Sequence, residues 1–177
     1  MMSIENFLRI LESLEINPLK LSGKTTLKGT RIGLYMVLSH IEAGWSIREM
    51  VNAYPTLSDK LEVLELIENN LQKVKCIHSL LKKLRLRIRY IDGIPYIKLS
   101  RKYIKIDNID KELLQDILRE EAKCLSEEEI SVFAKSLPKI VRPLNQLELE
   151  EYNLLKKLKK ESLETIKEKR KKALAVQ

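Results

Sequence analysis

The side chains that most often carry catalysis or bind metals are few in this sequence and lie far apart. The chain contains two histidines, His40 and His78, and two cysteines, Cys76 and Cys124. Neither histidine has metal-ligand spacing around it, and the cysteines lack the Cys-x-x-Cys spacing of a zinc site. We therefore predict no catalytic residue, no metal site and no cofactor. The cysteines are interpreted as small buried apolar residues without a disulfide framework.

One short motif suggests phosphate chemistry but fails on its context. Gly23-Lys24-Thr25 resembles the end of a phosphate-binding P-loop. That motif needs another glycine five residues earlier, where this chain has Pro18, and it needs a strand-to-helix junction. The many carboxylates do not lie in apolar runs that would raise their pKa for acid-base work. We therefore expect a binding protein and not an enzyme.

Positive charge is concentrated in one part of the chain. The 177 residues have a formal net charge of +8, and residues 73–105 alone carry eleven basic side chains against the single acidic Asp92. A partner responds to such a local field more than to the total charge. Phosphates of nucleic acids are the partners that a basic cluster of this density favours.

The alternation of residues within this basic window predicts a β-hairpin. Residues 84–91 alternate apolar and arginine side chains, and the following Asp92-Gly93 is typical of a two-residue hairpin turn. In the register that this turn sets, Arg89 lies opposite Tyr96 and Arg87 lies opposite Lys98. Like charges placed across the ladder destabilise it unless they are neutralised. We expect phosphates to neutralise them, the alternative being a solvated or acid-paired sheet face. The predicted nucleic-acid-binding residues are Arg85, Arg87, Arg89, Tyr96, Lys98, Arg101, Lys102, Lys82 and Lys83.

Apolar residues recur at helical spacing in most of the remaining chain. The predicted helices cover residues 4–15, 34–43, 46–54, 59–83, 109–118 and 145–172. Ser-x-x-Glu capping boxes begin at Ser46 and Ser126, and Gly44 is placed for a left-handed C-cap. The clearest predicted break contains Pro138 and Pro143. Before the second helix, residues 19–32 read as an extended loop or a small hairpin.

Two short helices followed by a longer one predict a helix-turn-helix unit. The expected fold is therefore mainly α, with a helix-turn-helix (winged-helix-like) core and a β-hairpin. A helical C-terminal region ending in a long amphipathic helix follows. We expect residues 1–106 to form the helix-turn-helix domain with its basic β-hairpin wing, and residues 107–177 to form a helical region for dimerisation or partner binding.

The predicted recognition helix is acidic, which conflicts with docking into a DNA groove. It begins at Ser58 and carries four acidic side chains against one lysine, a balance that phosphates repel. Either this helix faces a protein, or the hairpin and the basic end of the same helix contact DNA, and we favour the second. The predicted partner-binding residues are Glu62, Glu65, Leu155 and Leu158.

Four short motifs identify a family resemblance. They are Gly-Thr-Arg-Ile at 29–32, Ala-Gly-Trp-Ser at 43–46, Tyr-Pro at 54–55 and Leu-Ser at 57–58. With these motifs, residues 20–72 resemble the domain of unknown function 433, a helix-turn-helix-like family with VapB-type antitoxin members. The resemblance implies a DNA-binding fold that also contacts a protein, namely a toxin of the PIN-type ribonuclease class.

These observations lead to two functional hypotheses. The first is a DNA-binding transcriptional regulator that binds duplex DNA through the basic hairpin and forms a homodimer. The alternative is an antitoxin-like protein that neutralises a toxin-like partner. RNA binding is weaker, because the hairpin shows one tyrosine and not the aromatic pair of an RNA-recognition sheet. We also expect a cytoplasmic protein without a membrane segment, and a thermophile source from the Lys, Glu, Ile and Leu bias.

Overall fold

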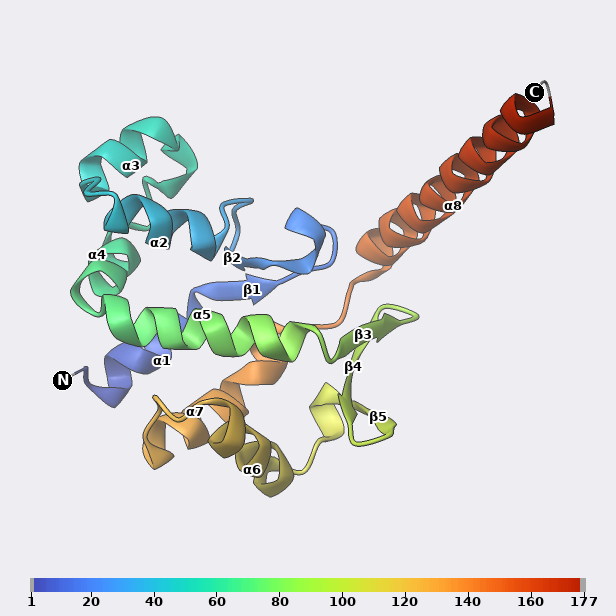
Figure 1. Cartoon of the computed structure of the whole chain (residues 1–177). Helices are drawn as coiled ribbons and strands as arrows, with labels where there is room; N and C mark the ends of the chain where they lie inside the picture. Colours follow the sequence, from blue (N-terminus) through green and yellow to red (C-terminus); the bar gives the residue numbers. More distant parts are fainter. Residues whose placement is uncertain (1, 176–177) are drawn as a thin grey trace. The chain divides into compact units, whose positions relative to one another are not determined.

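The computed structural model describes residues 2–175 and divides the chain into two compact units, Met1–Pro143 and Leu144–Gln177. The sequence instead predicts a boundary after residue 106. Residues 107–143 belong to the first unit because α6 (Lys111–Glu121) packs on α7 (Glu127–Ile140), and α7 packs along α1 (Ile4–Glu12) (Figure 1). The contact between α1 and α7 joins opposite ends of the unit, and no local pattern signals it.

The described chain is mainly helical, with two small antiparallel sheets and a long C-terminal helix, as the sequence predicts. Its other helices are α2 (Leu34–Glu42), α3 (Ile47–Ala53), α4 (Leu61–Asn69), α5 (Leu71–Arg85) and α8 (Gln146–Ala175), with the short 3-10 turns η1 (Leu21–Gly23), η2 (Pro55–Leu57) and η3 (Ile106–Asn108). The winged-helix arrangement stays a prediction.

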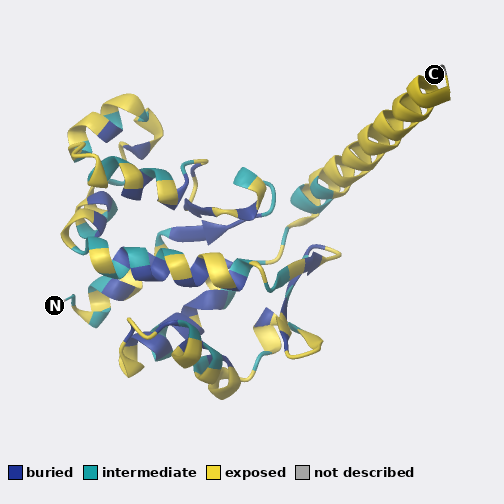
Figure 2. Cartoon of the chain, viewed as in Figure 1, coloured by how far each residue is buried: buried dark blue, intermediate teal, exposed yellow. Residues whose placement is uncertain are grey.

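The core of the first unit lies where α1, α4, α5 and α7 meet, and the buried face of each helix is dark in Figure 2. Phe7 of α1 and Phe133 of α7 are completely buried there, as are Leu64 of α4 and Ile77 of α5. Burying a large apolar side chain contributes about 1.5–3 kcal/mol. The core therefore stabilises the helices that carry the surfaces described below.

The predicted helix ends are confirmed where a capping side chain defines them. Ser46 and Ser126 each accept a hydrogen bond from the backbone N–H of the glutamate three residues later, and both capping boxes are complete. Gly44 has φ 89°, the left-handed conformation expected after α2. Local side-chain chemistry is sufficient to fix these boundaries.

The predicted long helix over 59–83 is wrong, because it is divided at Asn70. The backbone of Asn70 leaves helical geometry (φ −128°, ψ 38°), and its side-chain amide donates to the carbonyl of Leu66 at 2.9 Å. Asparagine competes in this way with the helical ladder. The predicted break over residues 136–143 is confirmed only in its second half, because α7 continues through Pro138 to Ile140 and the chain leaves helical geometry afterwards.

The two sheets are short hairpin-like elements. Strands β1 (Leu14–Ile16) and β2 (Thr25–Leu27) pair in antiparallel fashion, and β3 (Ile88–Ile91), β4 (Ile94–Leu99) and β5 (Lys102–Lys105) form the second sheet. The predicted turn and register of β3 and β4 are confirmed, with Asp92 and Gly93 both at positive φ. The third strand was not predicted.

The two cysteines form a disulfide, so the prediction of small apolar residues without a disulfide is wrong. Cys76 of α5 is buried, Cys124 in the loop before α7 is exposed, and their Cα atoms lie 6.3 Å apart. The bond closes a separation of 48 residues. It connects α5 to the loop between α6 and α7, two segments of the first unit that no local pattern brings together.

The second unit consists mainly of α8, which buries none of its described residues. Figure 2 shows this helix exposed along nearly its whole length. Large apolar side chains are among the exposed residues, including Leu155 at 49% and Leu158 at 51%. In the described part of the chain, no helix combines the length and the apolar character needed to cross a membrane.

Candidate nucleic-acid interface

One face of the second sheet gathers cationic and aromatic side chains. The register places Arg89 of β3 opposite Tyr96 of β4, and Tyr96 opposite Lys105 of β5. The next row pairs Lys98 with Tyr103. Because directly opposed residues, and residues two apart on a strand, share a face, all five side chains lie on the same side of the sheet.

The side chains on this face are accessible to a ligand. Four of them are exposed, and Tyr96 is half-buried. The Lys98 ammonium lies 5.9 Å from the centre of the Tyr103 ring, which keeps the cation close to an aromatic surface. Arg89 and Lys105 have no acidic partner among the described residues. We call these five residues, Arg89, Tyr96, Lys98, Tyr103 and Lys105, the basic sheet face.

The structure separates the predicted arginine row. Arg85 belongs to α5 and not to a strand, and its guanidinium donates to the carbonyl of Ser22 at 2.9 Å. The helix persists because Leu84 is completely buried and continues the apolar stripe of α5. Arg87 follows the helix and forms an ion pair with Glu121 at 2.7 Å. Of the three arginines in this predicted row, only Arg89 lies on the basic sheet face.

The remaining predicted cations are distributed over several places. Lys102 is exposed, but its register partner is Leu99, on the opposite face of the sheet. Arg101 lies in the exposed turn between β4 and β5. Lys83 of α5 donates to the backbone carbonyl of Glu121 at 3.3 Å, and Lys82 lines a pocket beside Arg85. The predicted nucleic-acid-binding residues therefore do not form one surface. Some lie on the basic sheet face, and the other cations are at separate places.

Sequence reasoning missed Tyr103 and Lys105. Strand β5 follows β4 after a two-residue turn in which Ser100 adopts φ 59°. Left-handed geometry is unusual for serine, so the turn sequence carries no signal comparable to Asp-Gly. The strand-favouring pair Tyr103-Ile104, one aromatic and one β-branched residue, is the signal that could have predicted the strand.

The predicted partner-binding residues lie on two separate elements. Glu62 and Glu65 are exposed on α4, and Glu62 already forms an ion pair with Arg9 at 2.8 Å. Leu155 and Leu158 lie on α8 in the second unit. The structure therefore supplies two distinct surfaces, one acidic and one apolar.

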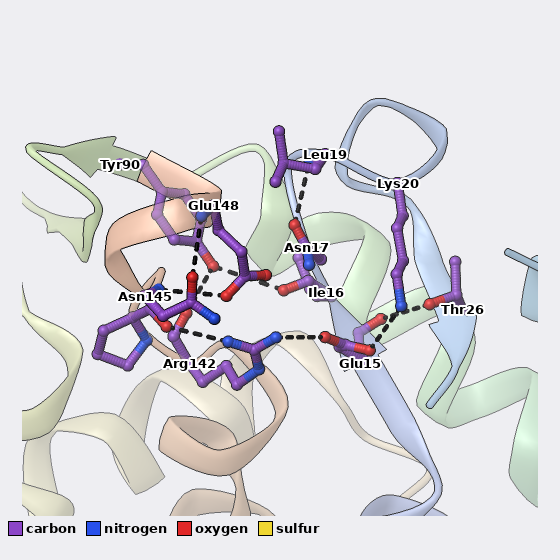
Figure 3. Close-up of polar contacts among 11 residues, drawn as sticks. Glu15, Ile16, Asn17, Leu19, Lys20, Thr26, Tyr90, Arg142, Asn145 and Glu148 are labelled. Carbon is purple, nitrogen blue, oxygen red and sulfur yellow. Dashed lines mark hydrogen bonds and ion pairs between the residues drawn. The ribbon is translucent and has the colours of Figure 1, made fainter. Parts of the chain in front are cut away.

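A buried ionic cluster holds β1 in place and was not visible from the sequence. Glu15 is 4% exposed, and its carboxylate lies 3.3 Å from Arg142 and 3.4 Å from Lys20 (Figure 3). The Tyr90 hydroxyl lies within hydrogen-bonding distance of two carbonyl oxygens, at 3.1 Å from that of Arg142 and 3.5 Å from that of Ile16, and shares its one proton between them. Cationic partners offset the desolvation of such a carboxylate. The cluster fixes β1 to β3 and to the end of α7.

The two histidines occupy different surroundings. His40 stacks on Trp45 with ring centres 4.2 Å apart, and its Nε2 lies 3.1 Å from the Tyr54 hydroxyl. Burial, followed by the nearby Lys82 charge, lowers the pKa of His78. No group of three or more His, Cys, Asp or Glu side chains among residues 2–175 is arranged to hold a metal ion.

Comparison with known proteins identifies one region of the chain. The model of a family described as "Protein of unknown function (DUF433)" matches residues 14–65. This match confirms the family resemblance that the motifs of residues 20–72 predict. No curated protein and no solved structure matches the chain.

Proposed function

We propose that the protein binds DNA as a transcriptional regulator, and we base this on the match of residues 14–65 to the DUF433 family model and on the basic sheet face. The supporting observation is that three cations and two tyrosines lie in two adjacent rows of one exposed sheet face. Lysine and arginine bind backbone phosphates, and tyrosine rings offer a surface on which unpaired bases stack. The acidic α4 stays outside this contact.

The experiment measures DNA affinity over a salt series for the native chain and for the triple variant Arg89→Ala/Lys98→Ala/Lys105→Ala. Each lost phosphate contact reduces the slope of log affinity against log salt by about 0.9 for duplex DNA. We expect the triple variant to lose affinity and about two to three slope units. Parallel measurements with single-stranded DNA and RNA report whether the two tyrosines select unpaired bases.

A matched control is the triple variant Lys28→Ala/Lys111→Ala/Lys123→Ala, which removes the same charge from exposed positions outside the basic sheet face. The proposal expects this control to retain most of the native salt slope. Equal losses in both variants would mean that only total charge matters. Salt-insensitive or absent binding by the native chain would overturn the proposal.

The DNA-binding form is proposed to be a homodimer formed through α8. Residues 146–155 carry three glutamates and no basic residue, whereas residues 156–172 carry nine basic and three acidic residues. Antiparallel pairing of two copies places the acidic half of each helix beside the basic half of the other. The same pairing covers the exposed leucines, which a lone helix leaves in water.

The antitoxin-like role is the alternative, and the exposed acidic face of α4 favours it. Glu65 and Glu68 are exposed there beside Glu62, and such a surface complements a basic protein better than DNA. This role requires a partner toxin of the PIN-type ribonuclease class encoded by a neighbouring gene. Co-expression should suppress the toxicity of that ribonuclease, and Glu62→Lys/Glu65→Lys should abolish the suppression while preserving the fold.

A further inference from the structure

A pocket of about 220 Å³ is lined by residues from three elements that contact one another in the first unit, β2, α2 and α5. Three elements contribute its walls: the start of β2, the first turn of α2 and the last turns of α5. The lining residues are Lys24, Thr25, Tyr35, His78, Lys82 and Arg85. We propose that this pocket binds a phosphate group, carried by inorganic phosphate or by a phosphate monoester.

The charge of the pocket is the first argument. Lys24, Lys82 and Arg85 line it without any carboxylate, and none of the three forms an ion pair with an acidic residue of the described chain. Three uncompensated cations around one small volume raise the local concentration of anions. Arginine contributes planar, bidentate hydrogen bonding to phosphate, and lysine acts as a point charge.

The shape of the pocket is the second argument. Pockets for drug-sized ligands have volumes of roughly 300–1,000 Å³, and this pocket has about 220 Å³. A phosphate group with a small substituent therefore fits better than a whole nucleotide. The Tyr35 ring holds the Lys24 ammonium at 5.1 Å from its centre, which places this cation at the rim before any ligand arrives.

A strained turn positions Arg85 for this role. Leu21, Ser22 and Gly23 all have positive φ (47°, 55° and 82°), and the Ser22 carbonyl accepts the hydrogen bond from Arg85. Left-handed backbone at non-glycine residues is strained and occurs often at binding sites. The turn leads directly to Lys24. One local structure thus fixes two of the three cations.

The site is not a P-loop, although Lys24 and Thr25 belong to the Gly-Lys-Thr segment. Thr25 begins strand β2 and not a helix, so no helix N-terminus faces the ligand. Phosphate recognition here depends on side-chain cations of α5, which lie about sixty positions after Lys24 in the sequence. It goes beyond the proposed DNA binding, because the pocket and the basic sheet face share no residue.

His78 provides an internal reporter of occupancy. In the free protein its pKa is lowered, first by burial and then by the Lys82 charge. The other charged or titratable groups that line the pocket with His78 and Lys82 are Lys24, Arg85 and Tyr35. One helical turn before His78, Lys75 of α5 forms an ion pair with Glu42 of α2. A bound phosphate offsets the cations and favours protonated imidazole.

The test follows the imidazole signals of both histidines by NMR while inorganic phosphate is added at constant ionic strength. We expect the His78 signal to move toward that of protonated imidazole in a saturable way. The signal of His40 should stay in place, because it lies outside the pocket. No saturable change at His78 would overturn the proposal.

A pair of adjacent lysines supplies the matched variants. Lys82→Gln removes a pocket cation, and Lys83→Gln removes an equal charge from the next position, which does not line the pocket. We expect Lys82→Gln to weaken phosphate binding about tenfold or more, since hydrogen bonds to charged groups contribute about 1.5–3 kcal/mol. Lys83→Gln should retain native affinity. Equal weakening by both variants would overturn a specific site.

Two further probes distinguish the source of the phosphate, and either positive result supports the pocket. Glycerol phosphate represents small phosphomonoesters, and a 5′-phosphorylated oligonucleotide is compared with its 5′-hydroxyl form. Displacement of inorganic phosphate by the 5′-phosphorylated strand alone assigns the site to nucleic-acid ends. Displacement by glycerol phosphate alone assigns it to small metabolites. The triple variant of the basic sheet face should leave these results unchanged, which separates this inference from the DNA-binding proposal.

Discussion

Arg87 and Arg89 stand two positions apart in one basic segment, but their surroundings give them different tasks. Arg87 is half-buried and forms an ion pair with Glu121, whereas Arg89 is exposed on the basic sheet face. A cation that already has an acidic partner must lose that partner before it can bind a phosphate. The residue type therefore predicts charge, and the neighbours decide whether it is available.

The two arginines can be compared by single substitutions. Arg89→Ala is expected to weaken DNA binding and to reduce the salt slope by about one unit. Arg87→Ala should leave the slope nearly unchanged and lower the free energy of unfolding by up to about 1 kcal/mol, the usual range for a partly exposed ion pair. Salt-series binding and urea unfolding of both variants provide the measurement, and reversed effects would refute the assignment.

Glu129 links the second capping box to α5. Its burial alone would raise the pKa of the carboxyl, but hydrogen bonds from Ser126 and the 2.9 Å contact with Lys73 outweigh burial and lower it. A folded pKa below the unfolded value stabilises the protein above the unfolded pKa. That stabilisation is lost as the pH falls through the lowered folded pKa.

We therefore expect Glu129→Gln to reduce the free energy of unfolding at neutral pH by about 1 kcal/mol or more, because a cap and a charged hydrogen bond weaken together. The difference between native and variant protein should shrink as the pH falls below the ordinary glutamate value of 4.5. Urea unfolding at a series of pH values measures it. A difference that is constant over pH would contradict the role of the charge.

At the scale of elements, the disulfide connects α5 to the loop before α7. Both segments lie next to sites discussed above. Helix α5 lines the phosphate pocket, and α6, which precedes the loop, provides Glu121 for the ion pair with Arg87. Stable disulfides form in oxidising compartments and in intracellular proteins of hyperthermophiles. The sequence predicts both a cytoplasmic location and a thermophile source. The disulfide is compatible with the first of these predictions only if the second also holds.

The double variant Cys76→Ala/Cys124→Ala should have a lower free energy of unfolding. A closed loop of this length corresponds to about 2–4 kcal/mol. Thermal unfolding with and without a reducing agent measures the effect: the native chain should lose stability in reductant, and the variant should not respond. An unchanged melting temperature of the native chain after verified reduction would show that packing alone holds the two segments.

At the scale of the whole molecule, the exposed leucines of α8 require an explanation. The described residues of this helix are all at least partly exposed. A long helix that buries nothing gains little from its apolar residues, because helices in proteins are stabilised mainly by packing. The proposed antiparallel pairing of two copies provides that packing.

Analytical ultracentrifugation can test the pairing. We expect the full chain to sediment as a dimer, and both the fragment 1–143 and the variant Leu155→Asp/Leu158→Asp to sediment as monomers. Because α8 buries no described residue, the fragment should retain the melting temperature of the first unit to within a few degrees. A monomeric full chain at the concentrations of the DNA assay would refute the dimer.

The sequence alone determined those features that depend on neighbouring residues. The capping boxes at Ser46 and Ser126, the turn at Asp92 and the register of the hairpin all follow from side chains a few positions apart. The helical fold class, the long C-terminal helix and the family motifs belong to the same group. Each depends on local geometry or periodicity, which can be read from a short stretch of the sequence.

The tertiary structure decided where the cations point and which of them are free. Complete burial of Leu84 extends α5 and removes Arg85 from the sheet, and Glu121 pairs with Arg87. The phosphate pocket and the disulfide likewise join segments about fifty to sixty residues apart in sequence. These outcomes depend on packing between elements that are distant in sequence, and a local sequence pattern contains no information about the energy of that packing. Only the folded chain therefore separates the available charges from the paired ones.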